Sequence, residues 1–133
     1  KASEYVSTSQ TLFNLKLLAY ERIILFIERI KPDSFIPRTL SPSLPYQEYQ
    51  LLLINEIRKE FEYNLSQQLY LSENAWEVTV NFKDNIITLI NSAATSCPPQ
   101  ATAGDLARKI LEHYISSDLK GDQISKIVKA EIQ

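Results

Sequence analysis

The stretch LKLLAYERIILFIERIKPDS, residues 15–34, is the strongest structural signal in the chain. Apolar residues recur there at helical spacing, and they form one continuous face that begins slightly upstream. A helix is therefore predicted from about Thr11 to Lys31, and it ends at Pro32, whose ring nitrogen cannot donate to the helical ladder. The residues of this main face are Leu12, Leu15, Ala19, Ile23, Phe26, Ile27 and Ile30.

The same helix carries apolar residues on a second side. Leu18 and Leu25, seven residues apart, lie opposite the main face and among charged side chains. A helix that is apolar nearly all round is buried on more than one side, so it is either central in a bundle or meets another chain. Glu21 and Arg22 lack an intrahelical partner, so they either reach solvent or pair across helices or subunits. The predicted interface on this helix comprises Leu18, Glu21, Arg22, Leu25, Glu28 and Arg29.

The pattern stays helical along the rest of the chain. Residues 1–10 are predicted to be a flexible polar lead-in, and residues 11–133 a single helical domain. Four prolines predict a loop over residues 32–45 that covers the core. Helices are predicted from about Pro45 to Leu71, from Glu73 to about Ser96, from the Thr102–Asp105 capping box to Ser116, and after Gly121. The expected fold is all-α, an antiparallel bundle of four main helices plus a short C-terminal helix.

Three tyrosines mark a second side of the helix predicted to start near Pro45. Tyr49, Tyr63 and Tyr70 follow one another at heptad spacing. Tyrosine is enriched at protein interfaces because its ring is apolar and its hydroxyl can still form a hydrogen bond. These three rings are therefore a second predicted interface, and the alternative is that they cover the loop or the first helix.

Composition excludes many kinds of site. The 133 residues carry a net charge of −2 and contain only two glycines, one cysteine and one histidine. Glycine-rich phosphate loops, common zinc sites and a disulfide framework are therefore excluded. No basic face suggests nucleic-acid binding, no apolar run is long enough to span a bilayer, and no signal-peptide pattern opens the chain. We expect no metal and no cofactor.

Two pairs of residues deserve comparison with known catalytic chemistry. Glu56 and Glu60 lie one helical turn apart and resemble paired carboxylates, but a solvated face beside Lys59 explains them better. Cys97 and His113 contain the elements of a nucleophilic pair, but no group that would orient the histidine is identifiable. A small, unreactive thiol is the preferred interpretation of Cys97. We therefore expect no catalytic residues and no enzymatic activity.

Two segments resemble a known family. LKLLAYERIILFIERIKPDS (residues 15–34) and EIRKEFEYNLSQQLYLSENAWEVT (residues 56–79) are similar to an uncharacterised family of small helical proteins from Bacteroidota. That resemblance implies a hydrophobic anchoring segment followed by a helical domain, and no catalytic residues. Because this sequence opens at Lys1 and lacks methionine, we expect it to be part of a longer protein with its membrane anchor upstream. The implied location is the cytoplasmic side of the inner membrane, or the cytoplasm.

Two functional hypotheses follow. The first is a non-enzymatic module that forms homo-oligomers or binds another protein through the first helix. The second is a bundle that binds a small molecule or lipid in an apolar cavity, with polar contacts from Asn64, Gln68 or Tyr20.

Overall fold

The computed structural model is all-helical and describes residues 2–118 and 120–132, with side chains from residue 7 on. No strand element occurs in these ranges, and a lone β-bridge joins Pro45 to Thr102. The all-α prediction is thus confirmed. The helices are α1 (Ala2–Ile30), α2 (Pro32–Thr39), α3 (Tyr46–Tyr63), the 3-10 helix η1 (Leu65–Tyr70), α4 (Glu73–Thr95), α5 (Ala103–Ser116) and α6 (Gly121–Ala130).

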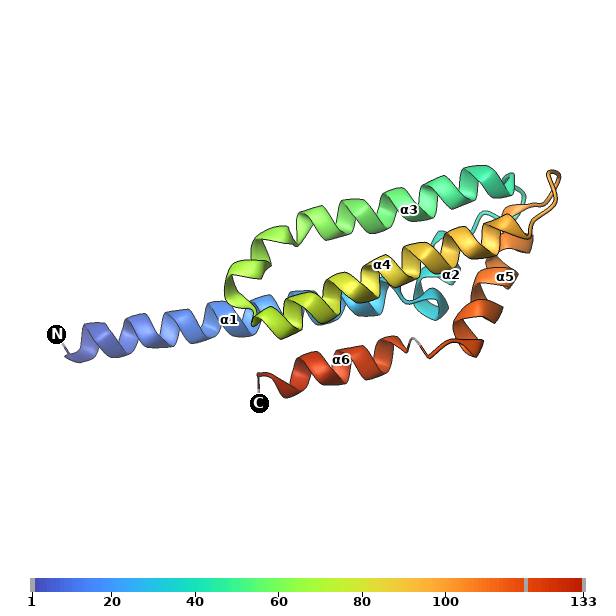
Figure 1. The fold of residues 1–133 in the computed structure, drawn as a ribbon. Helices are drawn as coiled ribbons and strands as arrows, with labels where there is room; N and C mark the ends of the chain where they lie inside the picture. The colour runs from blue at the N-terminus through green and yellow to red at the C-terminus, as the bar shows by residue number, and fades with distance from the viewer. Residues whose placement is uncertain (1, 119, 133) are drawn as a thin grey trace.

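The longer helices lie along a common direction. Figure 1 shows that the chain direction alternates along the four helices α1, α3, α4 and α6. The helices α2 and α5 lie at the end of the molecule where α1 ends. At the opposite end, α1 projects beyond the other helices. C-terminal to its projecting part, α1 packs against α6, η1 and α4. Helix α4 also packs against α3 and α5.

The core lies between these helices. Its fully buried large side chains come from α1, α2, α3 and α4, with α5 and α6 adding smaller contributions. Five residues of the predicted main face of α1 are buried, namely Ala19, Ile23, Phe26, Ile27 and Ile30. Leu12 and Leu15 were also expected there but are exposed, and Leu12 borders an open hollow beside η1 instead of being covered by it.

Three predicted boundaries differ from the structure. α1 begins at Ala2, so residues 2–10 continue the helix instead of forming a separate lead-in. Residues 32–39 form a short helix, α2, because a proline is tolerated in the first helical turn. Its Phe35 and Ile36 are buried, so the segment covers the core as predicted. α3 ends at Tyr63, eight residues before the predicted end, and the chain continues as η1.

Two predicted helix starts are confirmed by their caps. The Ser72 hydroxyl accepts a hydrogen bond from the backbone N–H of Ala75 at the start of α4. At the start of α5, Thr102 and Asp105 form a reciprocal capping box. Such caps satisfy backbone N–H groups that have no partner within the helix. The start of α6 depends on close packing, because a Cβ at Gly121 would lie 3.0 Å from the side chain of Lys31.

Candidate interaction surface

Leu18, Glu21, Arg22 and Leu25 form a continuous exposed patch on α1, called the α1 patch below. Their spacing of three, four and seven residues places them on one helical face. All four side chains are exposed, with Leu18 at 45% and Leu25 at 58%. The structure therefore brings together four of the predicted interface residues on an open surface.

The charges of the α1 patch are not satisfied within the chain. In the described part of the structure, neither Glu21 nor Arg22 forms an ion pair or a side-chain hydrogen bond. No buried side-chain nitrogen or oxygen atom lacks a hydrogen-bond partner in the same residue ranges. Glu21 and Arg22 therefore reach solvent, and they remain available to a partner that approaches this face.

Arg29 has a partner inside the chain. Its Nε and Nη2 atoms donate to the same Glu60 oxygen, at 3.1 and 2.9 Å. Arg38 approaches that oxygen at 3.8 Å, and the Glu60 side chain is only 17% exposed. The hydrogen bond with Glu60 raises the pKa of Arg29. This corrects two expectations, because Glu60 is not part of a solvated carboxylate face and Arg29 is engaged within the bundle.

Glu28 is also engaged within the chain. Lys31 Nζ lies 2.8 Å from one oxygen of Glu28, and the Ser125 hydroxyl donates to the other oxygen at 2.9 Å. Lys31 Nζ also lies 2.7 Å from Asp122. The hydrogen bond from Lys31 lowers the pKa of Glu28 against the opposing effect of burial, and the two carboxylates raise the pKa of Lys31. These contacts attach α6 to α1, so Glu28 serves the bundle rather than an open interface.

The predicted tyrosine stripe does not exist as one surface. Tyr49 is completely buried, and its hydroxyl lies 2.9 Å from the hydroxyl of Thr39. Burial raises the pKa of this phenol. Tyr70 is half-buried and belongs to η1, because α3 has already ended at Tyr63. The interface prediction is therefore wrong for Tyr49, and among the three rings Tyr63 is the exposed one, at 78%.

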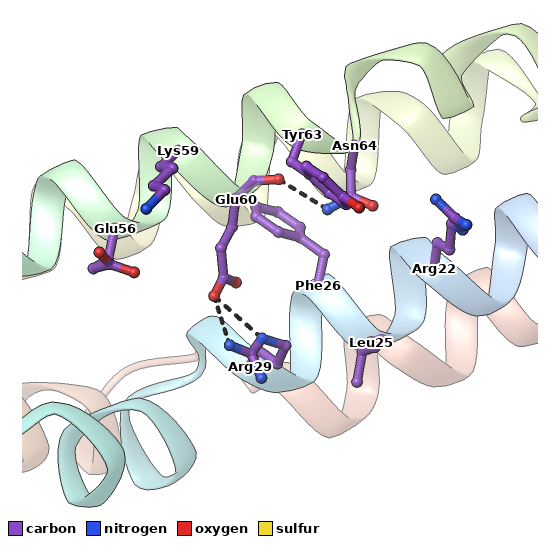
Figure 2. A pocket seen from close by; sticks show the side chains of 9 residues that line it. All are labelled: Arg22, Leu25, Phe26, Arg29, Glu56, Lys59, Glu60, Tyr63 and Asn64. Atoms are coloured by element: carbon purple, nitrogen blue, oxygen red, sulfur yellow. Dashed lines mark hydrogen bonds and ion pairs between the residues drawn. The ribbon is translucent and has the colours of Figure 1, made fainter.

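A groove separates α1 from α3 beside the α1 patch. Its volume is about 510 Å³, and Figure 2 shows its two walls, with Glu56 and Lys59 toward one end and Arg29 bonded to Glu60 across the middle. The apolar part of the lining is Leu25, Phe26 and Tyr63. Toward the other end, the Asn64 side chain donates to the backbone oxygen of Glu60 at 2.8 Å. The sequence carries no sign of this groove, because its walls come from segments that are far apart along the chain.

The remaining groove residues are charged. Arg22 lies on the α1 wall, and Glu56 and Lys59 lie on the α3 wall (Figure 2). Arg22 and Leu25 belong to both the groove and the α1 patch. The two features therefore form one continuous surface.

The residues considered for catalysis lie apart from this surface. Cys97 is buried, its sulfur lies 3.8 Å from the backbone oxygen of Ala93, and burial raises the pKa of its thiol. His113 is exposed on α5. No group of three or more histidine, cysteine, aspartate or glutamate residues is arranged to hold a metal ion in the described ranges. Among the helices of residues 2–118 and 120–132, none has the length and apolar character needed to cross a membrane.

A family model covers nearly the whole chain. Residues 2–133 match DUF7935, a family of unknown function. The chain belongs to this family. No curated protein and no solved structure shows significant similarity to it. Membership therefore agrees with the resemblance to an uncharacterised helical family, and it assigns no activity to any residue.

Proposed function

We propose that this chain is an antiparallel helical bundle that acts as a non-enzymatic interaction module and self-associates through the α1 patch. The observation that carries the proposal is the exposure of Leu18 and Leu25 on either side of Glu21 and Arg22, which have no partner inside the described chain. Burial of a leucine side chain contributes about 1.5–3 kcal/mol, so two leucines on each copy provide a driving force for association.

Light scattering after size exclusion tests this proposal over about 1–100 µM protein. We expect a dimer for the wild type and a monomer for the double variant Leu18→Ser/Leu25→Ser. The matched control is Leu51→Ser, which removes a leucine of similar exposure (62%) from α3 and leaves the α1 patch intact. A wild type that stays monomeric, or a double variant that still dimerises, would overturn the proposal.

A second candidate function is the binding of an apolar small molecule or lipid in the groove between α1 and α3. The groove volume of about 510 Å³ falls within the range of ligand pockets, and Leu25, Phe26 and Tyr63 offer apolar contacts. Of the three polar residues considered for such a site, only Asn64 lines the groove. Tyr20 is buried and its hydroxyl accepts a hydrogen bond from Ser72, and Gln68 lines a different hollow.

Native mass spectrometry and thermal shift with lipids test this second candidate. Ligand binding predicts added mass and a raised melting temperature, both lost in the variant Leu25→Ser/Tyr63→Ser. A protein without added mass, whose melting temperature does not respond to lipids, would exclude it.

We also propose that the protein is located beside a membrane, on its cytoplasmic side. The resemblance of segments 15–34 and 56–79 to the uncharacterised helical family supports this location. Fractionation of cells that produce the complete natural protein tests this placement. Recovery with the inner membrane is expected, and recovery wholly in the soluble fraction would contradict it.

A further inference from the structure

The α1 patch is nearly symmetric about its own centre. Leu18 lies three residues before Glu21, and Leu25 lies three residues after Arg22. A two-fold rotation about an axis that is perpendicular to the helix and passes between residues 21 and 22 therefore exchanges the two leucines. The same rotation exchanges the acid with the base. A surface with this property is complementary to a second copy of itself.

Charge distinguishes the two ways in which two copies of α1 can align. In a closed dimer with a two-fold axis, both copies use the same surface. A parallel pair would place Arg22 against Arg22 and Glu21 against Glu21, and like charges in contact oppose association. An antiparallel pair centred between residues 21 and 22 places Glu21 against Arg22 twice, and it places Leu18 against Leu25 twice.

From this complementarity, and on the basis of the proposed self-association, we infer that two copies dock through α1 in an antiparallel two-fold arrangement. Leu18 of each copy faces Leu25 of the other, and Glu21 of each copy pairs with Arg22 of the other. The two unpaired charges of the monomer thereby become two intermolecular ion pairs.

The neighbouring groove extends this contact. A stable interface typically buries about 800 Å² on each partner, which is more than the four side chains of the α1 patch provide. Arg22 and Leu25 also line the groove between α1 and α3, and Tyr63 stands exposed in its opposite wall (Figure 2). A second copy of α1 that lies along the patch also borders this groove. The ring of Tyr63 therefore packs on that second helix and adds to the interface.

Charge reversal tests the pairing of Glu21 with Arg22. Glu21→Arg and Arg22→Glu should each weaken dimerisation at least about tenfold, because each creates two like-charge contacts. The swapped variant Glu21→Arg/Arg22→Glu should restore the dimer, and so should an equal mixture of the two single variants, which forms a heterodimer. Analytical ultracentrifugation measures all four samples.

Cross-linking tests the direction of the helices. In a Cys97→Ala background, a mixture of the Leu18→Cys and Leu25→Cys proteins should form a disulfide-linked heterodimer under mild oxidation. A parallel pair would instead link Leu18→Cys to itself. Tyr63→Ala should weaken the dimer without lowering the melting temperature of the monomer, since this ring is mostly exposed there.

These outcomes separate the arrangement from the proposed function. A wild type that never dimerises defeats self-association and the arrangement together. Two results leave self-association standing and overturn the antiparallel arrangement. One is that the single charge reversals do not change the dimerisation affinity of the wild type. The other is that the Leu18→Cys protein cross-links to itself and not to the Leu25→Cys protein.

Discussion

The sequence Glu-Arg occurs twice on α1, at residues 21–22 and again seven residues later at 28–29. The two pairs occupy the same helical face but have different surroundings. Arg29 binds Glu60, and Glu28 binds Lys31 and Ser125. Glu21 and Arg22 have neither an ion pair nor a side-chain hydrogen bond within the described residues. Identical dipeptides therefore serve the bundle in one place and an open surface in the other.

The two arginines differ in what the α3 side of the molecule places beside them. α3 runs opposite to α1, so the residue one heptad beyond Glu60 would lie beside Arg22 if the helix continued. That residue is Gln67, but α3 ends at Tyr63 and Gln67 belongs to η1. Gln67 is also neutral, so neither α3 nor η1 offers Arg22 a carboxylate in the place where Glu60 meets Arg29.

The largest expected effect tests the two faces of α1. Ile27→Ala should lower the free energy of unfolding by about 2–5 kcal/mol, because Ile27 is fully buried and its truncation leaves a cavity. Leu25→Ala, on the exposed face, should change it by less than about 0.5 kcal/mol when measured on the monomer. Urea unfolding at low protein concentration measures both. Similar losses for the two variants would contradict the assignment of faces.

A smaller effect tests the two arginines. Glu60→Ala should lower the free energy of unfolding by about 1 kcal/mol, since it removes the shared carboxylate of Arg29 and Arg38 from a partly exposed site. Arg22→Ala should leave the free energy of unfolding of the monomer nearly unchanged. A double-mutant cycle with Arg29→Ala isolates the pair energy. An Arg22→Ala cost equal to that of Glu60→Ala would mean that Arg22 has a partner inside the chain.

The smallest expected effect is a loss of stability at acidic pH. The pKa of Glu28 lies below its ordinary value of 4.5, mainly because Lys31 donates to it. Its ionised form therefore adds stability above about pH 4.5, and this contribution is lost as the pH falls through the lowered pKa of the folded state. The lowered pKa of Asp122, which has the same cause, acts in the same direction.

Urea unfolding between about pH 7 and about pH 3 measures this dependence. Glu28→Gln should make the acid-induced loss of stability smaller, and Lys31→Met should do the same because it removes the common donor. A loss of stability equally steep in all three proteins would show that these carboxylates do not contribute.

Several elements were predictable because their causes are local. The periodicity of residues 15–30 predicted the buried face of α1, and Ser72 and Thr102–Asp105 predicted where α4 and α5 start. The end of α3 was missed, although Asn64 carried a local signal. Its side chain donates to the backbone oxygen of Glu60, and asparagine competes in this way with continued helix. The long α3 prediction also produced the incorrect tyrosine stripe.

The sequence by itself determined the helical class, the main capping sites, the apolar faces and the presence of unusual charges on α1. All of these depend on residues within one or two helical turns of each other. Only the tertiary structure decided which of those charges are paired, which tyrosine is exposed and where a groove opens. Those properties depend on residues that are distant in the sequence, such as Arg29 with Glu60 and Lys31 with Asp122. Spacing along one helix carries no information about the contacts that a second helix brings.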